Sequence, residues 1–148
     1  MSELRIVAVD VTIDETVRDW QRIHNLIIPT HLLSIDDVRE RSQRHHLEVA
    51  YASDEAVGNS TVRPPTDEEP AYTVIARVLP EHRERGVGTA LYERGLARAQ
   101  ETGATSIETV ILASNVEGLR FAERKGFVEL ERYVLPGDTI PYVTLRLQ

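Results

Sequence analysis

The sequence contains no cysteine, a single lysine and no long hydrophobic run, and each scarcity excludes a class of protein. Without cysteine there can be no disulfide, no thiol nucleophile and no cysteine-based zinc site. Lys125 stands beside 16 arginines, so a mechanism that needs a lysine depends on this one residue. The longest apolar runs, such as Ile6–Val9 and Val110–Ala113, span four residues, whereas a membrane helix needs about twenty.

Basic residues are fewer than acidic ones. The chain has 17 basic and 24 acidic residues, a formal net charge of −7. Nucleic acid and anionic membranes bind basic surfaces, so we expect neither as the main partner. The first residues carry Glu3 and no apolar stretch typical of a secretory signal, which favours a cytoplasmic protein. A length of 148 residues, 41% of them hydrophobic, fits one globular domain over residues 1–148.

The spacing of apolar residues predicts an α/β (α+β) domain with a mixed central sheet. The clearest helix is expected over Gly86–Thr102, where apolar residues recur on one helical face. Gly95 lies on that face and predicts close packing against the sheet, since glycine in a helix costs about 1 kcal/mol relative to alanine. We expect about six to seven strands, at 4–11, 47–52, 56–63, 71–79, 106–113, 127–134 and 142–147, and about four helices, the others at 14–25, 34–44 and 115–125.

A glycine-rich turn leads from one predicted strand into the central helix. The segment Val78–Leu91 reads VLPEHRERGVGTAL, with glycines at 86 and 88 and arginines at 83 and 85. The first turn of a helix has unpaired N–H groups and a partial positive charge, and glycine lets an anion approach them closely. The turn therefore favours a phosphate-type ligand, most naturally a diphosphate.

Three other interpretations of this turn are a purely structural turn, a P-loop and a dinucleotide-binding fingerprint. Short glycine motifs often do no more than supply a positive φ, and this remains open for the motif alone. A P-loop requires a lysine after the second glycine, and Thr89 stands there. A dinucleotide fingerprint requires a third small residue where Leu91 stands, directly after a tight strand–helix turn.

Two motifs together carry a resemblance to a known family. The strand end Val78-Leu79-Pro80 followed by Arg83-x-x-Gly86-x-Gly88 resembles the acyl-CoA-binding motif of GNAT-type N-acetyltransferases. The segment Asn115–Phe127, NVEGLRFAERKGF, is similar to a second helix motif of that family. The order of predicted elements also resembles that of the family over nearly the whole chain.

The resemblance implies acetyl-CoA, or another acyl-CoA, as co-substrate, with no metal. The two central parallel strands would splay apart, so that the cofactor wedges between them. Amides around Arg85 to Thr89 would hold the diphosphate, and a backbone N–H near Leu79 would stabilise the oxyanion. The implied cofactor-binding residues are Val78, Leu79, Arg83, Glu84, Arg85, Gly86, Val87, Gly88, Thr89, Asn115 and Phe121.

The implied reaction is direct attack of an amine, on a small molecule or a peptide, on the acetyl thioester. The chain departs from the family at Ala122, where a tyrosine usually protonates the departing thiolate. Tyr72 and Glu108 are weak replacements, and no catalytic residue is assigned. The alternatives are a GNAT-like module that binds acyl-CoA without efficient turnover, or a site for another phosphorylated ligand. The oligomeric state is open, a homodimer included.

Overall fold

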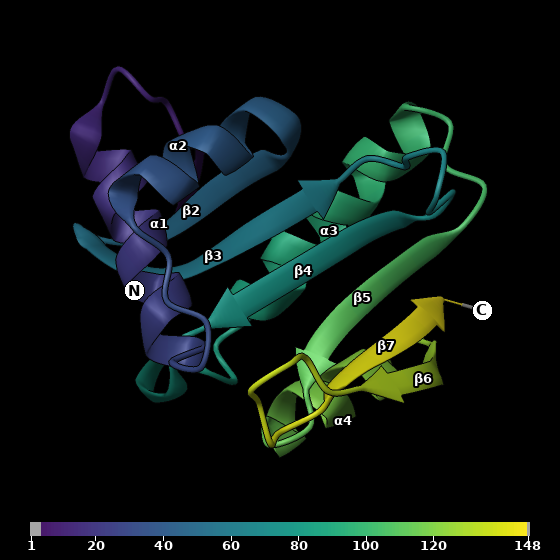
Figure 1. Ribbon diagram of the computed structural model, residues 1–148. Coiled ribbons are helices and arrows are strands. Elements are labelled where there is room, and N and C mark those ends of the chain that lie inside the picture. The colour runs from purple at the N-terminus through teal and green to yellow at the C-terminus, as the bar shows by residue number, and fades with distance from the viewer. Residues whose placement is uncertain (1–3, 148) are drawn as a thin grey trace.

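The computed structural model describes residues 4–147, which form a seven-stranded mixed sheet (Figure 1). All neighbouring strands run antiparallel except β4 and β5, which are parallel. The mixed sheet that the sequence predicts is confirmed. Its spatial order is β1 (Leu4–Ala8), β2 (His46–Ala52), β3 (Glu55–Arg63), β4 (Tyr72–Val78), β5 (Ile107–Leu112), β7 (Tyr142–Leu147) and β6 (Phe127–Tyr133).

Four α-helices cover the two faces of the sheet, two on each (Figure 1). On one face lie α1 (Asp14–Ile27) and α2 (Ile35–Arg44), and on the other α3 (Val87–Glu101) and α4 (Val116–Arg124). Ser34 starts α2 with a capping box, in which its hydroxyl accepts from the Asp37 amide and the Asp37 carboxylate accepts from the Ser34 amide. A single 3-10 turn, η1 (Pro80–His82), links β4 to α3.

The central helix α3 packs closely on β4 because Gly95 faces it. A Cβ at Gly95 would lie 2.5 Å from Cγ1 of Val74, closer than side chains approach one another. Leu91 and Ala99, on the same face of α3, are fully buried. The expectation that Gly95 marks a close approach of helix and sheet is confirmed.

The parallel strands β4 and β5 pair over a short length only. Their register comprises Tyr72 with Ile107 and Thr73 with Glu108, near the start of each strand. Beyond these pairs the two strands diverge, and Figure 1 shows them running apart toward the end of β4. The divergence leaves the edge of β4 from Val74 to Val78 unpaired by β5, which is the splay that the resemblance implies.

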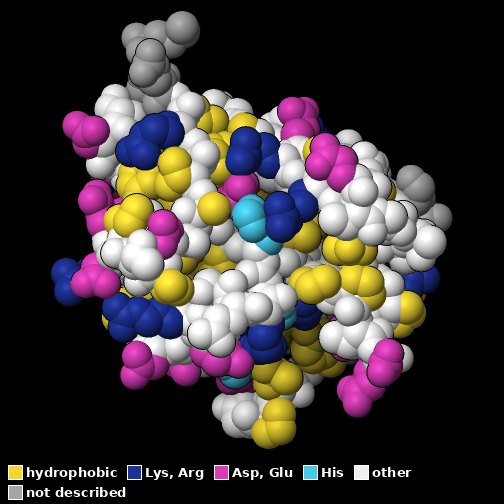
Figure 2. Space-filling view, turned by 90° about the horizontal axis from the view of Figure 1, so that it is seen from above, with side chains coloured by type: hydrophobic (Ala, Val, Ile, Leu, Met, Phe, Trp, Pro, Cys, Tyr) yellow, Lys and Arg dark blue, Asp and Glu magenta, His cyan; other side chains and the backbone are white. Residues whose placement is uncertain are grey.

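No helix of residues 4–147 is both long and apolar enough to cross a bilayer. Figure 2 looks at the molecule from the upper edge of Figure 1. On this face Lys and Arg side chains are scattered among Asp and Glu, without a continuous basic area.

Candidate functional site

The turn into α3 presents unpaired amides. Gly86 is the residue before the helix and has a φ of +85°, a left-handed conformation that glycine adopts without strain. Glu84, two residues earlier, has a φ of +65°, which is uncommon for a residue with a side chain. The first amide bonded within the helix is that of Ala90, which donates to the Gly86 carbonyl. The amides of residues 87–89 therefore point out of the helix end, where its partial positive charge favours an anion.

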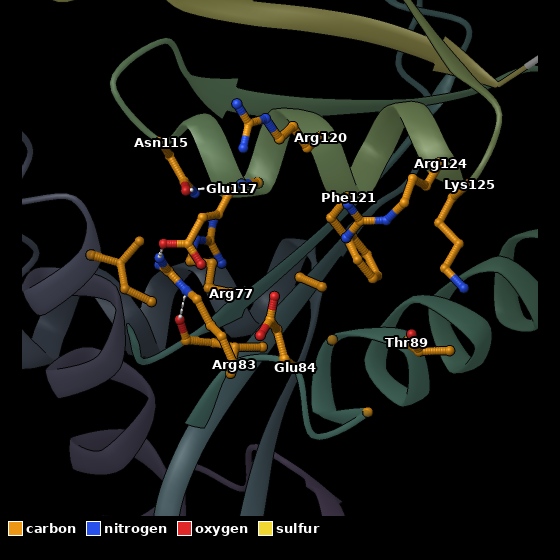
Figure 3. A pocket seen from close by; sticks show the side chains of 16 residues that line it. Arg77, Arg83, Glu84, Thr89, Asn115, Glu117, Arg120, Phe121, Arg124 and Lys125 are labelled. Atoms are coloured by element: carbon orange, nitrogen blue, oxygen red, sulfur yellow. Dashed lines mark hydrogen bonds and ion pairs between the residues drawn. The ribbon is translucent and has the colours of Figure 1, made fainter. Parts of the chain in front are cut away.

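A cavity of about 520 Å³ lies against these amides, a volume in the range of small-molecule sites. It is bounded by the end of β4, the start of α3 and one face of α4. Figure 3 shows Glu84 and Thr89 on one side of it and Asn115, Glu117 and Phe121 of α4 on the other. The cavity thus joins the end of α3 to the open edge of β4.

The open edge of β4 is formed by the backbone of Ala76 and Val78. In a strand, consecutive residues point their N–H and C=O groups to opposite sides. The Leu79 amide donates to the Val57 carbonyl of β3 at 2.9 Å, so the groups of Ala76 and Val78 face the other way, toward the splay. The amide that could serve an oxyanion is therefore not that of Leu79, and the amides of Ala76 and Val78 are the neighbours that point to the splay.

Arg83 spans the gap between β4 and α4. Its Nε donates to the Val78 carbonyl at 2.9 Å, and its Nη1 lies 3.5 Å from a Glu117 carboxylate oxygen (Figure 3). A ligand that donates a hydrogen bond to the Val78 carbonyl must displace this guanidinium. Arg83 therefore lies on the strand edge rather than at the amides of the α3 turn.

The helix α4 contributes a polar cap, an aromatic ring and three cations. The Asn115 side-chain oxygen accepts from the Gly118 amide at 3.0 Å, which leaves the Asn115 amide group as a donor toward the cavity. The Phe121 ring stacks on Tyr92 with centroids 5.2 Å apart. The cations that line the cavity from this helix and its C-terminal end are Arg120, Arg124 and Lys125.

A second cavity, of about 350 Å³, adjoins the first through the splay. Its walls combine apolar side chains with polar groups and come from the end of α1, from β4 and β5 and from the start of α4, with Tyr142 at the start of β7. Three charged residues, Arg77, Arg83 and Glu117, border both cavities. The splay therefore gives access from two directions, from α3 and α4 and from the α1 side.

Arg77 is a buried cation at the junction of the two cavities. It is 8% exposed, and its Nη1 donates to Asn59 Oδ1 at 3.2 Å and to Thr61 Oγ1 at 3.3 Å. Its guanidinium lies over the Trp20 ring, with Cζ 5.5 Å from the centroid. Burial, together with the nearby cations Arg41 and Arg63, lowers the pKa of Arg77 to about 9, so the group stays charged at neutral pH.

The structure brings together most, but not all, of the residues that the sequence singles out. Leu79 is buried against α1, Val87 is buried against β2 and β3, and the Arg85 side chain is exposed outside the cavity. Those that line the cavity are Val78, Arg83, Glu84, Gly86, Gly88, Thr89, Asn115 and Phe121. Sequence reasoning missed Arg77, Glu117, Arg120, Arg124 and Lys125. The missed signals were the lone charge within β4 and the i, i+4, i+5 spacing of cations on α4.

The residues weighed as proton donors lie away from the cavities. Ala122 is fully buried in the core that contains Phe127 and Val143, so position 122 does not line either cavity. Glu108 is bound by Arg146 at 2.6 Å across β5 and β7, and Tyr72 packs against the same core as Ala122. No three His, Asp or Glu side chains of residues 4–147 converge as metal ligands.

One comparison with known proteins identifies the family of this chain. The model of the acetyltransferase (GNAT) family matches residues 13–127. No curated protein matches the chain. Among solved structures, an N-acetyltransferase from Staphylococcus aureus Mu50 superposes with a TM-score of 0.78 at 16% identity, covering 99% of this chain and 98% of that one.

Two further solved structures show the same fold at similar distance. The putative acetyltransferase yncA from Salmonella typhimurium, solved with its cofactor acetyl-CoA, gives a TM-score of 0.74 at 19% identity over 98% of this chain and 93% of its own. A ribosomal-protein-alanine N-acetyltransferase from Brucella melitensis gives 0.76 at 16% identity over 96% and 98%. At these identities the likeness concerns the fold.

Proposed function

Because the chain belongs to the acetyltransferase (GNAT) family, we propose that it transfers an acetyl group from acetyl-CoA to the amine of a small molecule or peptide. The observation that carries the proposal is the 520 Å³ cavity that connects unpaired helix amides to an unpaired strand edge. A phosphate-bearing cofactor with an amide-containing arm needs these two features side by side.

The residues of the first cavity fit the parts of acetyl-CoA. The amides of residues 87–89 suit its diphosphate, and Arg120, Arg124 and Lys125 add positive charge for its phosphate groups. The open edge at Ala76 and Val78 suits the amides of the pantetheine arm, as an added strand would. With the arm along this edge, the thioester lies at the splay, where the second cavity begins.

The reaction is a direct transfer in one site. The amine nitrogen attacks the thioester carbonyl, the C–N bond forms, the C–S bond breaks and the sulfur leaves as thiolate. Holding both reactants in contact accounts for much of the rate in such a reaction. An amide of Ala76 or Val78, facing the splay, stabilises the negative charge on the carbonyl oxygen. The thiolate is a stable leaving group, since the pKa of a thiol is about 8.5.

Glu117 is the proposed acceptor of the amine proton. It is the one carboxylate among the described residues that borders both cavities. A carboxylate there can take the proton directly or through one water molecule. Glu117→Gln then lowers kcat by about 10²-fold or more and leaves the Kd for acetyl-CoA unchanged. An unchanged kcat would remove Glu117 from this role.

The experiment measures binding first and turnover second. Calorimetric titration with acetyl-CoA gives the Kd, and a thiol assay then follows release of free CoA with a panel of amines. We expect saturable binding and amine-dependent thiol release. The absence of acetyl-CoA binding would overturn the proposal as a whole.

A second candidate is an acyl-CoA-binding module with little turnover. It is favoured by Ala122, whose buried side chain offers no proton donor at the position where the family has a tyrosine. Tight binding of acetyl-CoA, with no thiol release across the amine panel, would identify this second function.

A further inference from the structure

Arg77 borders the second cavity, and two of the three nitrogen atoms of its guanidinium have no hydrogen-bond partner among residues 4–147. Its Nη1 group is engaged by Asn59 and Thr61, as described above, and Asn59 is itself fixed by donating its amide N–H to the Trp20 carbonyl at 2.9 Å. The Nε–H group is buried and has no hydrogen-bond partner among residues 4–147. Nor does any acceptor of the described residues bind Nη2.

The free donors lie on the edge of the group that binds carboxylates. Nε–H and one Nη2–H are parallel on a rigid plane, and their spacing matches the two oxygens of a carboxylate. Among residues 4–147 no Asp or Glu forms an ion pair with Arg77. The charged groups with the largest influence on its pKa are two other cations, Arg41 and Arg63. A buried cation of this kind normally has a partner of opposite charge.

The walls of the second cavity indicate which other chemical groups a ligand of Arg77 would have. Ala76 and Arg77 both border the second cavity, which begins at the splay where the thioester is proposed to lie. The cavity of about 350 Å³ has apolar side chains in its walls, among them Leu26, Ile27, Val110 and Leu112. It therefore suits a small molecule with an apolar side chain, an amine and an anionic group close to the amine.

We infer that the acceptor is an apolar amino acid, or a similar amino carboxylate, whose carboxylate is bound by the Nε–Nη2 edge of Arg77. This inference rests on the proposed acetyl transfer, for which it names the substrate class. Nε is buried, so binding of the second carboxylate oxygen to it requires a movement of the cavity walls. The same cation disfavours polyamines and other cationic acceptors.

The charge of Arg77 also acts on the reacting amine. A neighbouring cation disfavours the protonated form of an amine and so lowers its pKa. The bound carboxylate offsets part of this effect and draws the zwitterion into the site. Arg77 thus acts as a specificity-determining residue that positions the substrate, and it takes no part in breaking bonds.

The test compares matched amines after acetyl-CoA binding has been established by calorimetry. The probes are alanine, valine, leucine, methionine and phenylalanine, each set against its carboxamide. The amine of a carboxamide loses its proton more readily, so intrinsic reactivity favours the carboxamide and a preference for the acid must come from binding. We expect kcat/KM for the preferred acid to exceed that for its carboxamide by about 10- to 100-fold, the usual effect of one charge-assisted pair.

Arg77→Met removes the charge at similar length and should abolish this preference, chiefly by raising KM for the acid, while the variant still binds acetyl-CoA. Arg77→Lys keeps the charge without the paired donors, so it should retain part of the preference for the acid over the carboxamide. Arg63→Met is the matched control, since it removes one positive charge near the cavities but outside their walls, and should leave the preference intact.

Two sets of results overturn the inference while the proposed function stands. In one, the wild type turns over carboxamides or simple amines as well as acids, or turns over neither series but acetylates other amines. In the other, folded Arg77→Met and Arg77→Lys variants that bind acetyl-CoA keep the wild-type preference. Failure of acetyl-CoA to bind, seen before any amine is added, is the separate result that overturns the proposed function.

Discussion

Gly88 and Gly95 lie on one face of α3. Substituting Gly88 should impair acetyl-CoA binding without unfolding the protein, whereas substituting Gly95 should impair stability without changing binding. A Cβ at Gly88 would lie 3.5 Å from Val78 Cγ2 and 3.6 Å from Phe121 Cζ, which is ordinary contact. Gly88→Val should therefore fold, and valine is about 0.4 kcal/mol better than glycine in a helix. Its methyl groups would enter the cavity beside the helix amides. Gly86 is less informative, because its φ of +85° strains any side chain.

The expected loss of binding can be estimated from the hydrogen bonds at stake. One or two hydrogen bonds from amides to a charged phosphate contribute about 1.5–3 kcal/mol each, so the Kd for acetyl-CoA should rise at least about tenfold and up to about 10⁴-fold. Calorimetry measures the Kd, and urea unfolding confirms that the free energy of unfolding stays within about 0.5 kcal/mol of wild type.

Gly95→Ala is the matched control within the same helix. Its Cβ would meet Val74 Cγ1 at 2.5 Å, and overpacking of this kind costs about 1–3 kcal/mol, against a gain of about 1 kcal/mol in helix propensity. We expect a less stable protein with an unchanged Kd for acetyl-CoA. A folded Gly88→Val protein that binds acetyl-CoA as tightly as wild type would refute the reasoning about the α3 turn.

Three further predictions concern the cap of α4 and the response to acid. Asn115→Ala removes the α4 cap and should cost about 1 kcal/mol in urea unfolding and weaken acetyl-CoA binding, whereas an unaltered Kd would exclude Asn115 from the site. Burial alone would raise the pKa of Glu48, but Arg94, bound through two hydrogen bonds, and His46 outweigh it and lower this pKa to about 2. The ionised Glu48 should contribute up to roughly 3 kcal/mol to the free energy of unfolding above about pH 5, and this contribution should be lost toward pH 2. Urea unfolding of Glu48→Gln should therefore show a weaker loss of stability between about pH 5 and pH 2 than wild type. Burial, and then the charge of Arg77, lower the pKa of His24 to about 4, so stability should fall as the pH drops from 6.5 to 4, and the fall should shrink in His24→Phe; a pH-independent stability over that range would contradict this.

The features of the fold that the sequence predicts well depend on residues close together in the chain. Ser34 and Asp37 cap α2 through neighbouring residues, and Gly95 marks a close approach because a helical glycine has few other uses. Strand ends were less accurate. The first strand was expected to reach Val11 and ends at Ala8. The last backbone bond to β2 is from the Val9 amide to the Leu47 carbonyl, and Asp10 then turns the chain.

The burial of Arg77 depends on contacts across the sheet. Arg77 is the lone charge in an otherwise uncharged strand, which marks it in the sequence, but its burial follows from Trp20 and Asn59, which are distant in sequence. The resemblance implied an oxyanion-stabilising N–H near Leu79, yet the Leu79 amide is bonded to Val57, and one residue of register decides which side an amide faces. Such register is set by tertiary pairing.

The most direct test of the account is a crystal structure with acetyl-CoA bound. The account predicts diphosphate density within hydrogen-bond distance of the amides of residues 87–89, with the thioester beside Ala76 and Val78 at the splay. Diphosphate density at any other place on the protein would contradict it.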